Sequence, residues 1–260
     1  MSRRSIRLLG YTTVATGIAS YGIHRGLSHL EEKYPELPLA AGSKALNKPQ
    51  KNTQHCAYTN SYAAQIPLQA LEARVPSSKT PTKTELEYAW ARSVLGSKIL
   101  RAEGSIIGLL TSFRLTPGDT GNSAEGFSPD ETTGAPRLLL NGLMQVQRLP
   151  AADEDSNGLL VSAEMPDGPR EFFEKIARWG YPWRLMSSLR HEMSVSEPFQ
   201  MKGQGMFVEV RFTSAHDYEV VDEEGENQKT IPDWTLRVHR GFARFILDCT
   251  VRELQRDVGK

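Results

Sequence analysis

The order of periodic patterns along the 260-residue chain predicts an α+β fold. Two observations carry this prediction. Several segments alternate between apolar and polar residues and are separated by turn residues, as strands are. Other segments have apolar residues at helical spacing, and the longest of these ends the chain. We therefore expect a run of antiparallel strands, interrupted by a short helix, between an early helix and a long C-terminal helix.

Composition describes an ordinary globular domain with a tail. The chain is 39% hydrophobic and 24% charged, and 31 basic residues balance 31 acidic ones. A net charge of zero argues against a nucleic-acid partner, which usually requires a basic excess. Cys56 and Cys249 are too few for a zinc site or a disulfide framework. We expect them to be core or pocket thiols, with one distant disulfide left open.

Residues 1–30 are predicted to be a membrane anchor or a targeting segment. They contain no acidic residue, and Arg3, Arg4 and Arg7 precede the uncharged stretch Leu8 to Ile23. This stretch is short and polar for a membrane span. A signal-anchor helix is favoured over a mitochondrial presequence, a cleaved secretory signal and an ordinary tail. The predicted location is a membrane, through a single N-terminal anchor, with the mitochondrion as the alternative.

Residues 31–54 are interpreted as a linker, because they are rich in Lys, Pro and small residues and lack periodicity. The folded domain is then expected over residues 55–260. Its first element is a predicted strand from Tyr58 to Ile66, in which apolar residues share one parity and Pro67 ends the pattern.

The first helix of the domain is predicted from Glu85 to Leu100. Thr84 and Glu87 have the spacing of a capping box, and apolar residues follow at helical spacing. A break is expected at Gly104, with Ile106 to Leu110 as a continuation.

A flexible loop is predicted over residues 116–136, where Gly, Pro, Ser, Thr and Asp dominate. An insertion is favoured there over a lid above a site. A hairpin follows, with strands from Leu143 to Leu149 and from Leu159 to Met165 around the acidic turn Asp153 to Gly158.

A short helix is predicted to open at Asp167 and Pro169 and to stop at Gly180. The next segment, Trp183 to Val195, favours a strand by parity, although its leucines also fit a helical turn. The clearest strand runs from Met206 to Phe212.

The last part of the chain is predicted to be a strand pair followed by a helix. His216 to Val221 and Lys229 to Ile231 flank the turn Asp222 to Asn227, and Asp233 caps the final helix. The apolar stripe of this helix consists of Trp234, Val238, Phe242, Phe245, Ile246 and Cys249.

The order of elements from Tyr58 to Leu254 resembles the helix-grip fold of the START and polyketide-cyclase superfamily. Two segments are similar to those of small members: Trp90, Ala91, Val94 and Leu95, and the ending Val238, His239, Arg240, Gly241, Phe242 and Phe245. The resemblance implies a curved antiparallel sheet wrapped around the last helix, with an apolar cavity between them. An anchor joined to such a domain also resembles small accessory proteins of fungal natural-product pathways.

Three histidines are weighed for acid–base chemistry, because imidazole titrates near neutrality. His191 and His216 are the candidates, and His239 lies one residue from the apolar stripe of the last helix. His191 shares the parity of Leu189 and Met193 and is expected to face the core, and His216 follows the clearest strand. A single buried histidine is, however, more often structural than catalytic. The sequence has no nucleophile elbow, no phosphate-binding glycine motif and no His-Glu-x-x-His pair, so we expect neither a cofactor nor a metal.

The candidate ligand-binding residues are aromatic or polar side chains expected to face the interior: Tyr62, Trp90, Trp183, Arg211, Phe212 and Phe242. Most are also explained as core residues. In a partly hollow core they suit an apolar ligand. The sequence thus predicts a membrane-tethered protein with an apolar pocket, a cyclase or isomerase acting on a hydrophobic intermediate of secondary metabolism. The alternative is a noncatalytic lipid-binding or assembly protein of a mitochondrial membrane.

Overall fold

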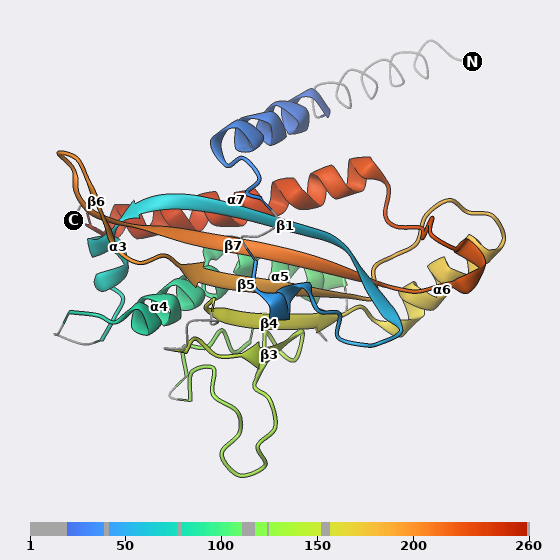
Figure 1. The fold of residues 1–260 in the computed structure, drawn as a ribbon, viewed down its shortest axis with the longest axis horizontal. Coiled ribbons are helices and arrows are strands. Elements are labelled where there is room, and N and C mark those ends of the chain that lie inside the picture. Colours follow the sequence, from blue (N-terminus) through green and yellow to red (C-terminus); the bar gives the residue numbers. More distant parts are fainter. Residues whose placement is uncertain are drawn as a thin grey trace.

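A curved antiparallel sheet and a long C-terminal helix dominate the computed structural model, which confirms the predicted α+β class (Figure 1). The structure describes residues 20–38, 42–76, 80–110, 118–123, 125–151 and 157–258. Within them the seven strands of the sheet follow the order β1-β7-β5-β4-β3-β2, and β6 pairs with β7 beside this path.

The strands are β1 (Gln54–Pro67), β2 (Leu138–Leu139), β3 (Met144–Arg148), β4 (Leu159–Glu164), β5 (Ser188–Val195), β6 (Phe199–Met201) and β7 (Gly205–Glu219). The helices are α2 (Lys44–Asn47), α3 (Leu68–Glu72), α4 (Lys83–Leu95), α5 (Lys98–Leu110), α6 (Asp167–Arg178) and α7 (Asp233–Val258). Residues 20–33 form a further helix, and Asp222–Glu224 form a short 3-10 helix.

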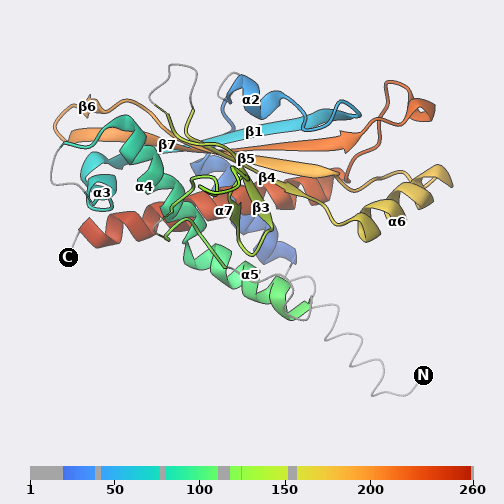
Figure 2. The same cartoon turned by 90° about the horizontal axis from the view of Figure 1, so that it is seen from below.

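The helices α4, α5 and α7 lie on one side of the sheet, whereas α2 lies on the other side (Figure 2). The pairing of β1 with β7 explains why α7 packs there. Tyr62 pairs with Phe212 and Ile66 with Val208, and all four side chains are buried. Because side chains alternate across a strand, these residues form one apolar face. That face and α7 enclose the main core.

The helix α7 begins at the predicted Asp233, but its exposed face differs from the prediction. Trp234, Val238 and Phe245 of the predicted stripe are exposed, and Ile246 is buried. The helix is covered from two directions, by the sheet and by helix 20–33, so its buried face is not a single narrow stripe. Periodicity alone does not identify the partners of a helix that packs on two sides.

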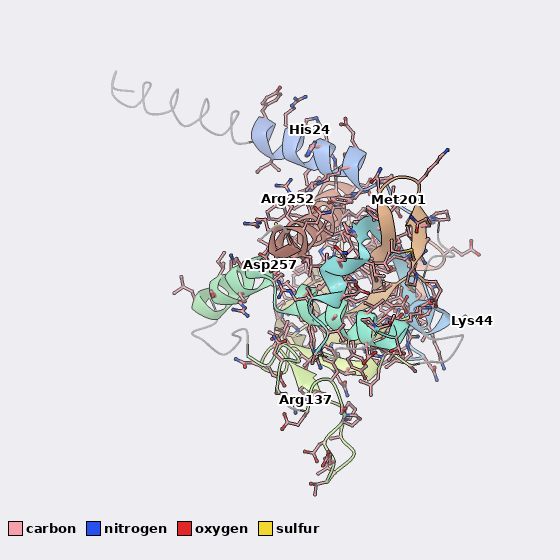
Figure 3. The ribbon with its side chains drawn as sticks, turned by 90° about the vertical axis from the view of Figure 1, so that its left-hand side faces the viewer. His24, Lys44, Arg137, Met201, Arg252 and Asp257 are labelled. Carbon is pink, nitrogen blue, oxygen red and sulfur yellow. The ribbon has the colours of Figure 1, made fainter. Side chains whose placement is uncertain are left out.

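Helix 20–33 packs across α7 and is bonded to it through polar side chains (Figure 3). Arg237 Nε donates to Glu31 Oε1 over 2.8 Å, and Arg237 Nη1 lies 2.9 Å from Nδ1 of His24. One turn on, a Cβ atom added to Gly241 would lie 2.0 Å from a methyl group of Leu27, so a larger residue there would require the Leu27 side chain to shift. The start of helix 20–33 therefore lies beside the first turns of α7.

Residues 31–54 differ from the predicted linker over their described part. Lys33 Nζ lies 2.6 Å from Asp248 Oδ1, and the buried Tyr34 hydroxyl donates to the same oxygen over 2.9 Å. Residues 44–47 form α2, and Gln54 already belongs to β1. Composition suggested a linker because this segment is anchored by polar contacts to distant residues, which leave no periodic pattern.

The helix α4 begins two residues earlier than predicted, because the capping box is formed by Thr82 and Glu85. Glu85 N donates to Thr82 Oγ1 over 3.3 Å, and Thr82 N donates to Glu85 Oε2 over 2.8 Å. The helical conformation is interrupted at Gly96, between α4 and α5, and it continues through Gly104. The predicted single helix is therefore two helices.

The described residues of the predicted loop 116–136 form turns, and the side chain of Phe127 in this segment packs into the core. Phe127 is buried and its ring stacks on Tyr88 at 5.9 Å. A Cβ atom on Gly121, whose φ is +79°, would lie 1.8 Å from this ring. The segment is thus packed against α4 at this point. Of the predicted turn 153–158, residues 153–156 lie outside the described residues.

The strands near the middle of the sheet differ from the predicted ones in length. β5 begins at Ser188, so Trp183 precedes it, and no helical turn forms there. β7 continues without a break from Gly205 to Glu219, because it pairs with β1 on one side and β5 on the other. Lys229 to Ile231 do not form a strand.

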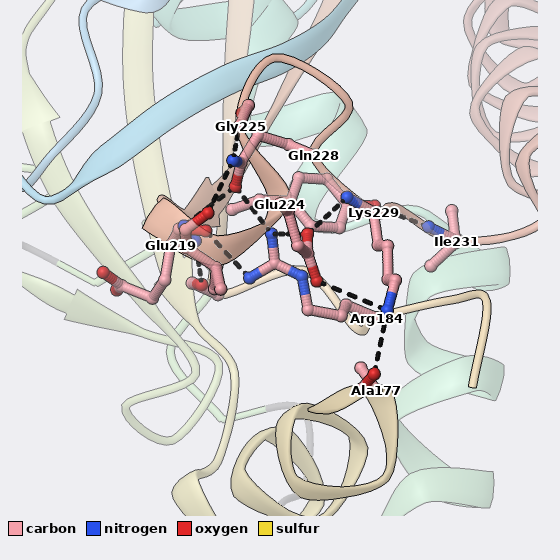
Figure 4. A network of polar contacts seen from close by, with 11 residues as sticks. Ala177, Arg184, Glu219, Glu224, Gly225, Gln228, Lys229 and Ile231 are labelled. Atoms are coloured by element: carbon pink, nitrogen blue, oxygen red, sulfur yellow. Dashed lines mark hydrogen bonds and ion pairs between the residues drawn. The ribbon is translucent and has the colours of Figure 1, made fainter. Parts of the chain in front are cut away.

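The turn after β7 is held by side chains rather than by strand pairing (Figure 4). The buried Arg184 donates to Glu219 O over 2.9 Å and lies 3.1 Å from a carboxylate oxygen of Glu224. Lys229 Nζ donates to Ala177 O over 2.8 Å. These bonds join the turn to the C-terminal end of α6.

Candidate functional site

An apolar cavity lies between the sheet, α5 and α7. Its volume is about 410 Å³, which is within the usual range for a small-molecule site. Strands β3, β4, β5 and β7 supply one wall, and α5 and α7 supply the other. Its apolar lining includes Met144, Val161, Met193, Phe212, Phe242 and Ile246.

His191 lines this cavity, as its parity predicted. Strand register places it opposite Ser214, and its Nδ1 atom lies 2.9 Å from Ser214 Oγ. Its ring stacks on Phe212 at 5.0 Å. Burial, with a smaller contribution from His239, lowers the pKa of His191 to about 3. The imidazole is therefore neutral at pH 7, and its Nε2 atom has no hydrogen-bond partner among the described residues.

His216 does not line the cavity but is bonded to a histidine that does. His216 Nε2 and His239 Nε2 are 2.8 Å apart, so one of these nitrogens donates and the other accepts. Burial lowers the pKa of both residues, and for His216 the neighbouring His239 adds to this effect. His216 Nδ1 is buried and has no partner among the described residues. The pair is thus a polar support behind the cavity wall.

Glu103 of α5 is the acidic counterpart of His191 in the same cavity. Burial raises the pKa of its carboxyl group. One apolar environment thus favours the neutral form of both an acid and a base.

The sequence candidates did not include Glu103, whereas His239 was weighed together with His216. Glu103 does carry a signal, since it is an isolated acidic residue within the apolar helix α5. His239 precedes the predicted pocket residue Phe242 by one helical turn. The contact between His239 and His216 joins α7 to β7 and has no local signal in the sequence.

Of the predicted ligand-binding residues, the structure brings Phe212 and Phe242 to the cavity. Trp90 is in the core, and its Nε1 atom donates to Arg211 O over 2.8 Å. Tyr62 is buried, and the guanidinium group of Arg244 lies over its ring, 4.3 Å from the ring centre.

The pKa of Tyr62 is raised to about 12, mainly by burial. Arg211 is paired with Glu209 at 2.7 Å, and Trp183 lies on the surface beside Tyr181. None of these three residues lines the cavity.

Among the described residues, no group of three or more His, Cys, Asp and Glu side chains has the geometry of a metal site. Cys56 and Cys249 are free thiols and are not bonded to each other. No helix in the described part of the chain is long and apolar enough to cross a membrane. The predicted anchor falls mainly on residues 1–19, which lie outside the described residues.

Comparison with protein-family models, with curated proteins and with solved structures finds no match for this chain.

Proposed function

We propose that the chain is a helix-grip-like enzyme that binds an apolar biosynthetic intermediate in this cavity and catalyses its isomerisation or cyclisation by proton transfer. The observation that carries the proposal is the presence of Glu103 and His191 on one apolar cavity, each favoured in its neutral form. Pairs of titratable groups whose pKa values are shifted by their surroundings are typical of acid–base sites.

The chemistry uses the two groups together. In the proposed step, the protonated carboxyl group of Glu103 donates its proton to a carbonyl oxygen of the substrate, while His191 Nε2 removes a proton from the adjacent carbon. The products are an enol, a carboxylate and an imidazolium. The carboxylate and the imidazolium attract each other in the apolar cavity, which offsets the weak basicity of His191. For an isomerisation, the imidazolium then gives its proton to another carbon while the enol O–H returns its proton to the Glu103 carboxylate. For a ring closure, the enol carbon attacks a carbonyl carbon of the substrate, the enol O–H proton returns to Glu103, and the imidazolium protonates the alkoxide that forms.

The shape of the cavity supports this role. Orientation of a flexible substrate supplies much of the rate enhancement in reactions of this class, and it requires no nucleophile. Phe212 stacks on His191, and Phe242 lines the same space, so the two rings limit the poses of a ligand near Nε2.

A noncatalytic lipid carrier is the second candidate. The largely apolar lining favours it, because a carrier needs burial of apolar surface and little else. Both candidates require the same cavity and differ in whether His191 and Glu103 are needed for more than binding.

The membrane location is also part of the proposal, and the end of the molecule near α6 supports it. Phe172, Trp179 and Trp183 are 58%, 75% and 37% exposed. The ammonium group of Lys175 lies 5.4 Å from the centre of the Trp179 ring. Aromatic residues beside basic ones are typical of membrane-interface contacts. Trp234, in the first turn of α7, is 67% exposed as well.

The cavity and helix 20–33 both reach this end. Met165 and Pro166, which precede α6, line the cavity. The start of helix 20–33 lies beside Arg237, one turn after Trp234. A bilayer at this end would therefore be close to both the predicted anchor and the cavity.

The first test compares His191→Gln and Glu103→Gln with the wild type in the native host. We expect the pathway product downstream of the enzyme to fall by about a hundredfold or more, because acid–base groups contribute that much to a rate. Product is measured by mass spectrometry, and protein abundance by immunoblot. His29→Gln and Glu171→Gln change the same residue types at exposed positions and should leave the product unchanged.

Binding is measured separately with the apolar fluorophore N-phenyl-1-naphthylamine. Both cavity variants should retain it, whereas Ala163→Leu, which fills part of the cavity, should weaken it. Unchanged product at unchanged protein abundance would reject catalysis and leave the carrier. Failure of the wild type to bind the fluorophore would reject both candidates.

The second test concerns the membrane. The double variant Phe172→Ser/Trp179→Ser should bind vesicles of phosphatidylserine and phosphatidylcholine about tenfold more weakly than the wild type, since it removes two exposed aromatic rings. Binding is measured by co-sedimentation of the full chain. Met206→Ser, at an exposed apolar position at the start of β7, is the control and should bind as the wild type does. Equal binding by all three proteins would count against contact through α6.

A further inference from the structure

A second cavity of about 270 Å³ lies between α4, α5 and the C-terminal half of α7. Its lining is polar, in contrast to the first cavity. The polar residues around it are Arg74, Arg92, Ser93, Arg101, Asn122, Thr250 and Glu253. Three guanidinium groups thus surround a space that contains one carboxylate.

Arg92 is the central residue of this cavity. Its guanidinium group lies 5.8 Å from the centre of the Tyr88 ring, which itself stacks on the buried Phe127. Its Nε atom is buried and has no hydrogen-bond partner, and within the described residues no carboxylate is paired with Arg92. A buried donor without a partner is costly. The ring contact fixes the guanidinium plane and leaves its N–H groups for an acceptor that enters the cavity.

The other charges around the space leave it positive. Arg74 is paired with Asp257 at the surface, whereas Arg101 is exposed and has no ion pair among the described residues. Glu253 therefore faces more positive charge than it can balance. A planar guanidinium matches the oxygens of a phosphate group better than an ammonium does, because it donates two parallel hydrogen bonds.

We propose that this cavity binds a phosphoryl group, with Arg92 and Arg101 as its principal donors. The proposal is independent of the proposed catalysis. The site is also adjacent to the apolar cavity, since Leu100 lines that cavity and Arg101 lines this one. On α7, Ile246 lines the apolar cavity and Thr250, one turn later, lines the polar one. The phosphoryl group therefore belongs either to a free phosphate or to the head of an amphiphile.

The experiment measures binding of inorganic pyrophosphate and of the soluble lipid dihexanoyl phosphatidic acid by isothermal titration calorimetry. The full chain is compared with Arg92→Met, Arg101→Met and the control Arg178→Met, which removes the same charge from an exposed position on α6. We expect Arg92→Met and Arg101→Met to weaken binding by about tenfold or more, while Arg178→Met has no effect. Arg101 is exposed, so its variant tests the site even where Arg92→Met unfolds the protein.

Similar binding of both probes would assign the site to a free phosphate, and preference for the lipid would assign it to an amphiphile. Each result supports a phosphoryl site. The proposal would be overturned if neither probe bound the wild type. It would also be overturned if Arg178→Met weakened binding as much as Arg92→Met and Arg101→Met do.

Discussion

Asp217→Ala is expected to destabilise the folded chain by about 3–5 kcal/mol, the usual cost of leaving one partner of a buried ion pair. Asp217 and Arg190 are 0% and 2% exposed, and Arg190 Nη2 donates to Asp217 Oδ1. Ser188 Oγ donates to the other carboxylate oxygen over 3.1 Å. Removal of the carboxylate would leave the guanidinium buried between β5 and α2, where it also donates to Lys48 O.

The measurement is urea unfolding followed by circular dichroism. Asp257→Ala removes the carboxylate of the exposed pair with Arg74 and should cost less than about 1 kcal/mol. The double variant Arg190→Met/Asp217→Ala should be more stable than Asp217→Ala, since it no longer contains an unpaired buried charge. If Asp217→Ala cost no more than Asp257→Ala, the buried pair would not contribute to stability in this way.

Glu87→Gln is expected to stabilise the chain in alkaline solution and to have much less effect in acid. Glu87 is 1% exposed on the inner face of α4, and its oxygens lack hydrogen bonds of normal geometry to the described residues. Burial raises its pKa from 4.5 to about 7, against smaller lowering effects of Lys83 and the Val195 backbone. The folded state therefore keeps its proton at pH values where the unfolded state has lost it.

The sign follows from this difference in bound protons. As the pH rises from 4.5 to about 7, the wild type loses stability, and above about pH 7 the loss is complete. At about 1.4 kcal/mol per pKa unit, the loss reaches about 3 kcal/mol. Glu87→Gln has no ionisable group at this position and does not lose this stability. Its free energy of unfolding relative to that of the wild type should therefore rise by about 3 kcal/mol from pH 4.5 to pH 8.

Chemical unfolding across this pH range tests the prediction. Glu171→Gln, at an exposed position on α6, is the control and should follow the wild type at every pH. Parallel curves for Glu87→Gln and the wild type would show that Glu87 ionises in the folded chain as it does in the unfolded one.

The parts of the fold that could be predicted are those in which burial is one-sided. β7 alternates between apolar and polar residues from Val208 to Phe212, and His191 shares the parity of its apolar neighbours, so both the strand and the inward direction of His191 were predicted correctly. The C-terminal helix was predicted from its start at Asp233, but its buried face was not, because the sheet and helix 20–33 both cover it. Local periodicity reports which face is buried as long as a single partner covers it.

The parts that were missed depend on contacts between distant residues. Helix 20–33 has few apolar residues facing α7, and Arg237, Glu31 and His24 hold it there, so its sequence resembles a tail. Trp90 was assigned to the pocket because an inward-facing aromatic residue has the same sequence periodicity whether it lines a cavity or fills the core. The polar cavity is assembled from α4, α5 and α7, and its α7 residues Thr250 and Glu253 are far in the sequence from Arg92 and Arg101.

The contact of helix 20–33 with α7 also limits where a removable N-terminal leader could end. A peptidase that cut at residue 30, where the acid-free segment ends, would remove most of the helix that covers Gly241 and Arg237. A cut before residue 20 would release a mature protein that keeps the whole helix. A leader whose removal kept the contacts of helix 20–33 with α7 would therefore have to end before residue 20.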